Sequence, residues 1–202
     1  MKKLIIIFGI LLGPLYAMAQ QPKMHIKLFG GWNANAFVDR MEGAKAEYLH
    51  GWQAGGGFRV MHRKAFLEAD ITFLKYGLTY QFDDDWEGLI TEPLDIRIRS
   101  LEIPINMGYV PVKTPLLKWF LYGGLVNKFN LNGRITYEDI EETFKPSELN
   151  LHIYNLGARF GTQLDIAMFN FDLSYTIGIT NSFKGRLRTN SHRVMLSVGL
   201  AL

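Results

Sequence analysis

The sequence contains no cysteine, and beyond its first 16 residues it contains no long apolar run. Without cysteine the chain forms no disulfide, performs no thiol chemistry and offers no site for a lipid-modified N-terminus. Without roughly 20 consecutive apolar residues, the remainder of the chain cannot cross a bilayer as a helix. The other structure that satisfies every backbone hydrogen bond inside lipid is a closed β-barrel. If the mature chain spans a membrane, we therefore expect it to do so as a barrel.

The first 19 residues have the features of a secretory signal peptide. Lys2 and Lys3 precede an apolar run from Leu4 to Tyr16, and Ala17-Met18-Ala19 has the small-x-small form of a cleavage site. We expect a signal peptide over residues 1–19 and a single domain over residues 20–202. The alternative is an uncleaved anchor helix, for which the run is too short, because a span needs roughly 20 residues.

The chain also has little excess charge of either sign. It contains 22 Lys and Arg against 19 Asp and Glu, a formal charge of +3. Removal of the signal segment takes away two lysines and no acid, so 20 basic residues face 19 acidic ones and the charge falls to +1. The basicity therefore belongs mostly to the targeting signal, and we expect no nucleic-acid partner.

Two C-terminal segments alternate large apolar residues with small or polar ones. In residues 169–180 the odd positions are Phe, Phe, Leu, Tyr, Ile and Ile, and the even positions are Asn, Asp, Ser, Thr, Gly and Thr. In residues 193–202 the even positions are apolar in the same way. This period of two is typical of a strand between lipid and a polar lumen. Similar reading of the whole chain predicts eight strands, at about 24–35, 52–61, 65–77, 96–109, 118–131, 150–164, 169–180 and 192–202.

The predicted connections alternate in length. Long polar connections cover 36–51, 82–95, 132–149 and 181–191, and short ones cover 61–64, 111–115 and 165–168. An even number of strands with both termini on the short-turn side is the layout of bacterial outer-membrane barrels. We predict an all-β fold, an eight-stranded antiparallel transmembrane up-and-down β-barrel in the cell outer membrane. Its long loops then lie outside the cell, and its wall contacts outer-membrane lipids and lipopolysaccharide.

A soluble barrel of the lipocalin type is the alternative, with its apolar face turned inward around a ligand. Such a barrel would cover its outside with Lys and Glu. Here the polar positions are mainly Ser, Thr, Asn, Gln and Gly, which favours a narrow and crowded interior.

Two strands leave the facing of their side chains open. In 118–131 the lipid-facing set is either Trp119, Leu121 and Leu125 or Phe120, Tyr122 and Val126, and we favour the first. In 96–109, Arg97 and Arg99 share parity with apolar residues. Either a bulge near Ser100 changes the phase of the strand, or the two arginines lie at the height of the lipid headgroups.

Once the faces are assigned, eight charged residues are expected to point into the lumen. Four are basic and four are acidic: Lys27, Arg59, Arg159, Arg193, Glu68, Asp70, Glu102 and Asp172. A barrel of eight strands is just wide enough to be filled by side chains. Buried charges cost several kcal/mol each unless they are paired, so we expect a network of ion pairs and hydrogen bonds that plugs the lumen. The alternative is a path for ions or solutes lined by the same groups.

One segment carries a family resemblance. Residues 101–104 read Leu-Glu-Ile-Pro, and this strand resembles the corresponding strand of the PorT-like outer-membrane β-barrel family common in Bacteroidetes. The order of the signal peptide, the Gln-Gln start, the glycine-rich early strands and residues 119–124, which resemble the family's Tyr-Gly-Gly step, is similar as well. The resemblance implies an outer-membrane barrel, and the family takes its name from a component of protein secretion.

Two of the long connections carry clusters of charge. The acidic cluster contains Asp83, Asp84, Asp85 and Glu87, and the basic cluster contains Lys184, Arg186 and Arg188. The acidic run imitates the first half of a calcium loop, but Leu94 stands where the closing acid belongs, so we expect no metal site and no cofactor. These loops are candidate surfaces for lipopolysaccharide phosphates or for proteins of an envelope or secretion complex.

No catalytic group stands out. Some small outer-membrane barrels modify lipid A, and Ser191 beside His192 suggests such a site, but neighbouring strand residues point to opposite faces. We therefore expect a protein that is not an enzyme. Two roles remain, a structural or docking module in an envelope or secretion assembly, and a small ion or solute channel. A lipid A-modifying enzyme is a third, less favoured hypothesis.

Overall fold

The computed structural model describes residues 23–38, 44–82, 94–137, 140–146, 148, 151–181 and 190–202. The predicted signal peptide, residues 1–19, lies outside these ranges. The described residues form nine strands: β1 (Lys23–Val38), β2 (Ala44–His62), β3 (Ala65–Phe82), β4 (Leu94–Lys113), β5 (Leu117–Tyr137), β6 (Ile140–Phe144), β7 (Tyr154–Ile166), β8 (Phe169–Gly178) and β9 (Asn190–Ala201). In this part of the chain no helix has the length and apolar character needed to cross a membrane.

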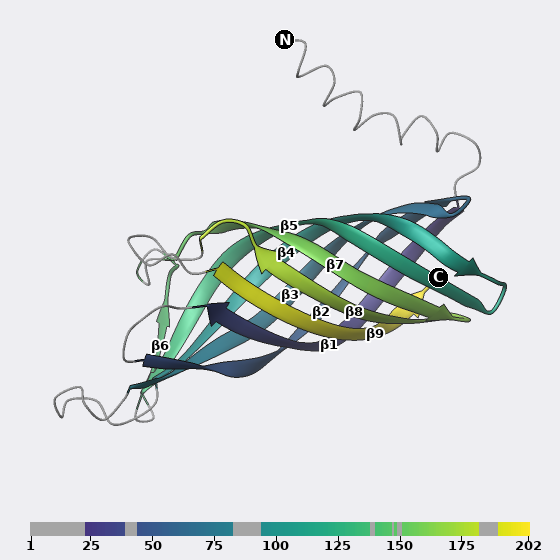
Figure 1. Ribbon diagram of the computed structural model, residues 1–202. Coiled ribbons are helices and arrows are strands. Elements are labelled where there is room, and N and C mark those ends of the chain that lie inside the picture. Colours follow the sequence, from purple (N-terminus) through teal and green to yellow (C-terminus); the bar gives the residue numbers. More distant parts are fainter. Residues whose placement is uncertain are drawn as a thin grey trace, which may run out of the picture.

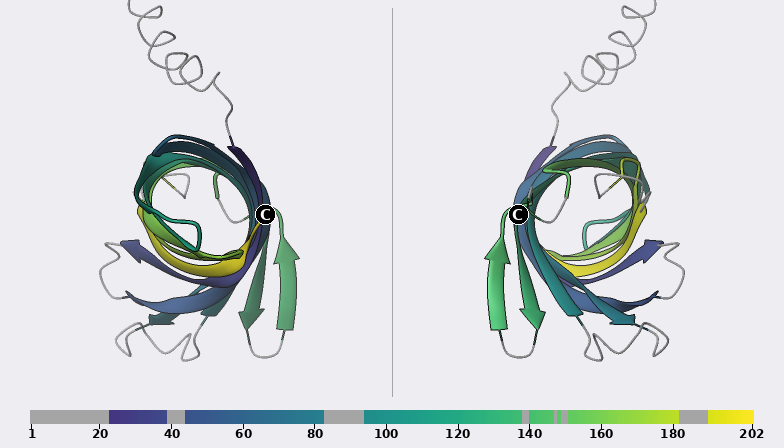
Figure 2. Two further views of the ribbon diagram at one scale, coloured as in Figure 1. Left: turned by 90° about the vertical axis from the view of Figure 1, so that its right-hand side faces the viewer. Right: turned by 90° about the vertical axis from the view of Figure 1, so that its left-hand side faces the viewer.

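Eight of the strands close into a barrel in which every pairing is antiparallel (Figure 1). Neighbours along the chain are neighbours in the sheet, β7 follows β5 directly, and β9 closes the ring against β1. The views along the barrel show the closed ring and β6 standing outside it, paired with β5 (Figure 2). The predicted eight-stranded up-and-down barrel is therefore confirmed. The C-terminus and the short turns share one end of it, which we call the short-turn end, and β6 lies at the other, the long-loop end.

Several strands run further than their alternating pattern predicts. The predicted loop 132–149 contains the end of β5 and all of β6, and the predicted loops 36–51 and 82–95 include the ends of β1 to β4. The turn expected at 111–115 begins only after Lys113, and β7 begins at Tyr154 instead of residue 150. An apolar outer face is needed only where lipid touches the strand. Backbone pairing continues beyond it, so the apolar pattern ends before the strand does.

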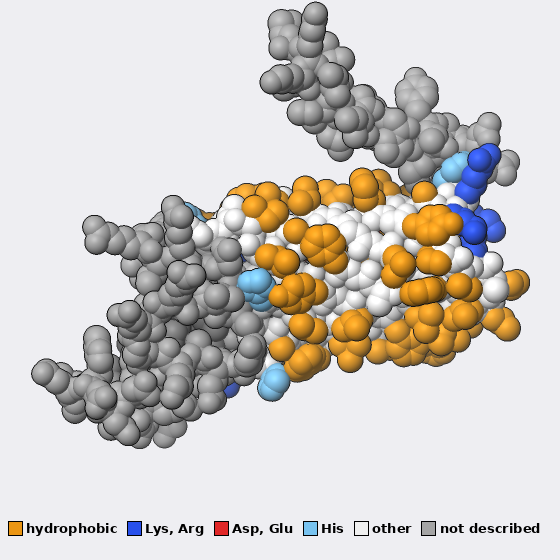
Figure 3. Space-filling model, in the orientation of Figure 1, with side chains coloured by type: hydrophobic (Ala, Val, Ile, Leu, Met, Phe, Trp, Pro, Cys, Tyr) orange, Lys and Arg blue, Asp and Glu red, His pale blue; other side chains and the backbone are white. Residues whose placement is uncertain are grey.

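Side chains alternate between the outside and the lumen as the sequence predicts. On β8 the outward residues Phe169, Phe171, Leu173 and Tyr175 are exposed, while the residues between them are buried. On β5, Trp119, Leu121 and Leu125 face outward, which confirms the preferred set of the two. The space-filling view shows apolar side chains scattered over the barrel wall (Figure 3). The apolar surface is therefore on the outside, where lipid would contact it. The lipocalin-like alternative, with the apolar face turned inward, is wrong.

The question of Arg97 and Arg99 is settled by the position of the bulge. The register between β4 and β5 shifts next to Ser100, but the extra residue is Leu131 on β5. Strand β4 keeps its phase: Ile98, Ser100 and Glu102 are buried, whereas both arginines are exposed on the outer wall. The idea that β4 itself changes phase is therefore wrong.

The short-turn end of the lumen is closed by apolar side chains. Met61, Phe66, Val110 and Phe120 are buried there in one cluster that also includes Tyr122. The Phe66 and Phe120 rings meet edge to face with centroids 5.2 Å apart, a favourable geometry for an aromatic pair. The interior therefore has an apolar cap at this end and a polar middle.

Candidate functional site

All eight charged residues assigned to the lumen lie inside the barrel and are buried. Seven strands supply them: β1 (Lys27), β2 (Arg59), β3 (Glu68, Asp70), β4 (Glu102), β7 (Arg159), β8 (Asp172) and β9 (Arg193). They reach the interior because each holds a position of the inward parity on its strand. Their contacts divide them into two groups, one around Arg59 and one around Glu102.

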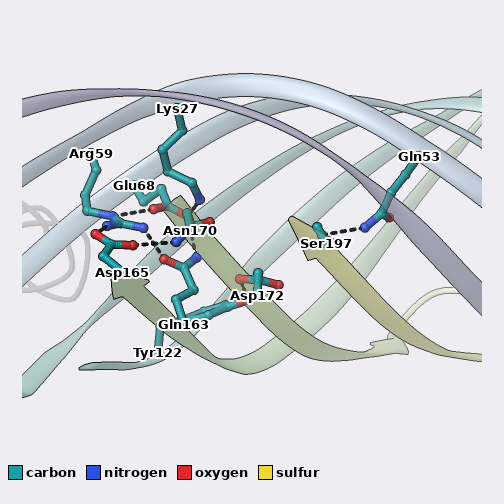
Figure 4. A network of polar contacts seen from close by, with 10 residues as sticks. All are labelled: Lys27, Gln53, Arg59, Glu68, Tyr122, Gln163, Asp165, Asn170, Asp172 and Ser197. Atoms are coloured by element: carbon teal, nitrogen blue, oxygen red, sulfur yellow. Dashed lines mark hydrogen bonds and ion pairs between the residues drawn. The ribbon is translucent and has the colours of Figure 1, made fainter. Parts of the chain in front are cut away.

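Arg59 is the centre of the first group and is fully buried (Figure 4). Its Nε donates to Glu68 Oε2 at 2.7 Å, and its Nη1 donates to Asp165 Oδ2 at 2.7 Å. Its Nη2 donates to Gln163 Oε1. The guanidinium also lies 4.1 Å from the centroid of the Phe120 ring, so its face contacts the apolar cap. One arginine thus joins β2, β3, β5 and β7 across the lumen.

The acids of this group have further partners. Lys27 Nζ and Gln163 Nε2 each donate to Glu68 Oε1 at 2.9 Å. Asn170 Nδ2 donates to Asp165 Oδ1 at 2.6 Å. All four carboxylate oxygens of Glu68 and Asp165 therefore accept a hydrogen bond, which is the condition under which buried charges are tolerated.

Glu102 is the centre of the second group. Arg193 Nη2 lies 2.5 Å from both carboxylate oxygens of Glu102, and Arg159 Nη2 lies 3.5 Å from Oε2. Arg159 also contacts Thr176 Oγ1 and the Met195 sulfur, each at 3.4 Å. Glu102 belongs to the Leu-Glu-Ile-Pro segment, so this segment supplies the counter-charge for two arginines, one on β7 and one on β9.

Asp70 and Asp172 take no part in the ion pairs among the described residues. Asp172 Oδ2 accepts a hydrogen bond from the Tyr122 hydroxyl at 2.8 Å. Asp70 Oδ1 is buried and has no hydrogen-bond partner in the structure. The network therefore does not pair the eight predicted residues among themselves one to one.

Sequence reasoning missed several members of the network. Asp165, assigned to a short turn, is the last inward residue of β7 and pairs with Arg59. It follows Arg159 and Gln163 at even spacing, so extending the parity of the strand would have found it. Lys128 on β5 is also buried, with Nζ 3.3 Å from the Tyr76 hydroxyl. With these two, five buried bases face five buried acids in the described part of the chain.

Gly161 on β7 makes room for the largest side chain of the network. It pairs with Tyr122 across the strands, and an ideal Cβ at Gly161 would lie 2.4 Å from the Tyr122 hydroxyl oxygen. The absence of a side chain here lets the Tyr122 ring lie against the β7 backbone and reach Asp172.

Substitution Gly161→Ala is expected to displace the Tyr122 ring and break its hydrogen bond to Asp172. Overpacking of this kind typically costs about 1–3 kcal/mol of unfolding free energy. Urea unfolding of the barrel in lipid vesicles, followed by tryptophan fluorescence, measures the change. Gly123→Ala is the matched control, because a Cβ there meets the Phe160 ring at 3.4 Å, an ordinary contact. Equal stability of the two variants would contradict the role given to Gly161.

Little space is left inside the lumen. A cavity of about 10 Å³ lies among Lys27, Glu68, Asp70 and Arg159, and one of about 20 Å³ lies beside Glu102 and Arg193. A water molecule needs roughly 10–15 Å³ measured in this way, so each cavity holds about one. The side chains therefore fill the barrel and leave no column of water along these cavities.

The remaining predicted residues can be placed only in part. The acidic cluster (Asp83, Asp84, Asp85, Glu87) and the basic cluster (Lys184, Arg186, Arg188) lie outside the described residues. His192 Nδ1 lies 2.6 Å from the Tyr175 hydroxyl on the outer wall, a contact that does not involve Ser191. Among the residues that the structure places, no group of three or more His, Cys, Asp and Glu is arranged to hold a metal ion.

Comparison with solved structures places the barrel among known outer-membrane proteins. Ail, the attachment invasion locus protein of Yersinia pestis, superposes with a TM-score of 0.51 at 10% identity, covering 89% of this chain and 99% of Ail. Neisserial surface protein A matches with a TM-score of 0.49 at 10% identity, covering 90% of this chain and 99% of that protein. At such low identity the likeness concerns the fold. None of the curated proteins compared with the chain matches its sequence.

The sequence itself identifies the family. Residues 18–184 match the family described as outer membrane protein beta-barrel domain, which covers most of the chain. The match agrees with the closed barrel, its apolar outer wall and its polar interior, and it gives the protein an outer-membrane location. The chain belongs to the outer membrane protein beta-barrel domain family.

Proposed function

We propose that this protein is a plugged barrel that serves as a docking module in the outer membrane. In this role the barrel is anchored in the membrane and presents a binding surface to a partner. It conducts no solutes. The observation that carries the proposal is the filled lumen, in which ten buried charged side chains leave cavities of only about 10 and 20 Å³.

The ion pairs explain why the plug is expected to persist. Arg59 on β2 holds Asp165 on β7, and Arg193 on β9 holds Glu102 on β4, so both contacts cross the interior. A path for ions would require these side chains to separate. Breaking a buried pair costs about 3–5 kcal/mol when one partner is left without counter-charge. A small channel is the alternative function, and this cost argues against it.

The long-loop end offers a surface for a partner. Pairing of β2 with β3 continues to Ala44 and Phe82, whereas pairing of β7 with β8 ends at Gly157 and Gly178. One side of the wall therefore extends beyond the other, and β6 forms its edge (Figure 1). We call this extension, formed by β2 to β6, the outer sheet. Among the described strands β6 pairs only with β5, which leaves backbone groups on its other side able to receive a strand.

The chemistry of the partner follows from sequence as well as from geometry. The acidic cluster at residues 83–87 connects two strands of the outer sheet, and the basic cluster at residues 184–188 precedes β9. Clusters of opposite charge suit a protein surface with mixed charges. The Leu-Glu-Ile-Pro resemblance to the PorT-like family of Bacteroidetes favours a partner in an envelope or protein-secretion complex. We assign no enzymatic activity, because the His192 imidazole is engaged by Tyr175 and not by Ser191.

Planar bilayers test the plug. We expect the mature protein, folded in detergent and inserted into such bilayers, to give no reproducible unitary currents, because each cavity beside the charged groups has room for about one water molecule. A conducting porin measured in the same bilayers shows that single channels are detectable. Reproducible currents of a single amplitude would favour the channel.

Photo-crosslinking in intact cells tests docking independently. Thr143 is exposed on β6, and Met168 is exposed at a short turn at the other end of the barrel. With a photo-reactive phenylalanine derivative in place of Thr143, we expect one dominant adduct with an envelope protein. The same substitution at Met168 is the matched control and should give a different pattern. If both positions give the same adducts, or Thr143 gives none, docking through the outer sheet is wrong.

A further inference from the structure

A group of cations faces outward on the wall where β3, β4 and β5 enter the outer sheet. Arg97 and Arg99 are exposed, and Lys75 and Arg134 are half-buried. All four line one surface hollow, and Lys75 and Arg97 also border an adjoining hollow of about 220 Å³ beside Trp52. We call these four residues the outer basic patch.

The height of the patch follows from the register of the strands. One row of paired residues runs from Leu173 on β8 through Leu196 and Trp32 to Trp52, and then to Lys75 and Arg99. Because barrel strands are tilted, such a row climbs along the axis as it crosses the wall. Its outward residues change from leucine to tryptophan to cation. Tryptophan is typical of the membrane interface, so the row leaves the apolar band there, on the long-loop side.

An apolar wall lies directly beneath the patch. The next outward row toward the short-turn end pairs Phe73 with Leu101 and Leu101 with Phe129. The Trp52 and Phe73 rings lie 5.7 Å apart, which continues this apolar surface up to the hollow. A molecule with a charged headgroup and acyl chains could therefore contact the cations with its headgroup and the apolar side chains, which lie nearer the short-turn end, with its acyl chains.

Three cations of the patch have no ion-pair partner among the side chains that the structure describes. The ion pairs between side chains that the structure describes lie inside the lumen, and none of them involves Lys75, Arg97 or Arg99. Lys75 stands directly opposite Arg99 across the strands. Like charges in directly opposed positions destabilise a sheet. An anion bound between them would remove this repulsion.

We propose that the outer basic patch binds the phosphate groups of lipopolysaccharide, with the acyl chains of the lipid against Phe73, Leu101 and Phe129. Arginine recognises phosphate through paired N–H donors, and Lys75 adds a point charge. Long loops of outer-membrane barrels lie outside the cell, so this end meets the lipopolysaccharide leaflet. The site is on the barrel wall, and its hollow also borders Thr143 of β6.

Binding of labelled lipopolysaccharide to the folded protein in neutral detergent tests the proposal. The probe carries both lipid A phosphates, and fluorescence anisotropy gives its affinity. For the triple variant Lys75→Gln, Arg97→Gln, Arg99→Gln we expect affinity at least about tenfold weaker, because three charge-assisted contacts to phosphate are lost. Dephosphorylated lipopolysaccharide should bind the unaltered protein about as weakly as intact lipopolysaccharide binds the triple variant. Millimolar inorganic phosphate should not displace the probe, since it lacks the acyl chains.

The matched control changes three cations at the opposite end of the barrel. Lys23, Arg63 and Lys64 are exposed there, and Lys23→Gln, Arg63→Gln, Lys64→Gln should leave binding unchanged. The single variant Arg99→Glu provides a second test and should weaken binding without removing any internal contact. Heat-modifiable migration in gels verifies that each variant is folded. Unaltered affinity of the triple variant, an equal loss in the control, or displacement by inorganic phosphate alone would overturn the assignment.

Discussion

Replacing Arg59 with methionine is expected to lower the free energy of unfolding by about 3–5 kcal/mol, the usual cost of removing one partner from a buried ion pair. Arg59 is fully buried and donates to Glu68, Asp165 and Gln163. Methionine fills a similar part of the lumen but donates no hydrogen bond. Asp165 is then left with Asn170 alone, and Glu68 keeps Lys27 and Gln163.

Urea unfolding in lipid vesicles, followed by tryptophan fluorescence and by heat-modifiable migration, measures this loss. Arg63→Met is the matched control, because Arg63 is the same residue type but is exposed at a short turn. We expect it to be nearly neutral, as is usual for surface substitutions. Adding Asp165→Asn to Arg59→Met should restore part of the lost stability, because it removes the carboxylate that the first substitution leaves without a counter-charge. Strictly additive losses would show that the two residues do not interact.

The second large effect is expected for Glu102→Gln, with a loss of about 3 kcal/mol of unfolding free energy. The substitution keeps the shape of the side chain and removes its charge. Arg193, 2.5 Å from both carboxylate oxygens, and Arg159 at 3.5 Å then lose their counter-charge in the same part of the lumen. Thermal unfolding and urea unfolding should both shift toward lower stability.

Asp172→Asn is the control for Glu102→Gln. It also removes one negative charge from the lumen. However, Asp172 accepts a hydrogen bond from the Tyr122 hydroxyl, and the amide oxygen of asparagine can still accept that bond. We therefore expect a smaller loss. Adding Arg193→Met to Glu102→Gln should recover stability, because it removes an arginine without a partner. An unchanged melting profile for Glu102→Gln would count against the network.

The two groups explain how an interior rich in charge is compatible with a stable barrel. Around Arg59, every carboxylate oxygen of Glu68 and Asp165 accepts a hydrogen bond. Around Glu102, one acid serves two arginines. A narrow lumen keeps these side chains within contact distance of the opposite wall. The same property that stabilises the barrel leaves little room for solute, which links stability to the proposed role.

Much of this fold could be predicted from local patterns. The alternation in residues 169–180 assigned Phe171 to lipid and Asp172 to the lumen, and burial confirms both positions. The same rule brought Arg59 and Glu102 inside. It did not extend far enough on β7, where Asp165 was assigned to a turn, and it did not predict β6. At β6, strand pairing continues past the part of the wall that lipid would cover. The sequence of β6 therefore has no alternating apolar face from which the strand could be predicted.

Local alternation was enough to give the number of barrel strands and the facing of their side chains, because neighbouring residues of a strand point to opposite faces and the face toward lipid must be apolar. Which charges meet depends on the closed barrel. Arg59 and Asp165 are 106 positions apart, and Arg193 and Glu102 are 91 apart. Their contacts depend on the stagger of the strands and on closure of the ring, which bring opposite walls within reach. The same stagger raises Lys75 and Arg99 above the apolar band, although they lie in one row with Leu173 and Leu196.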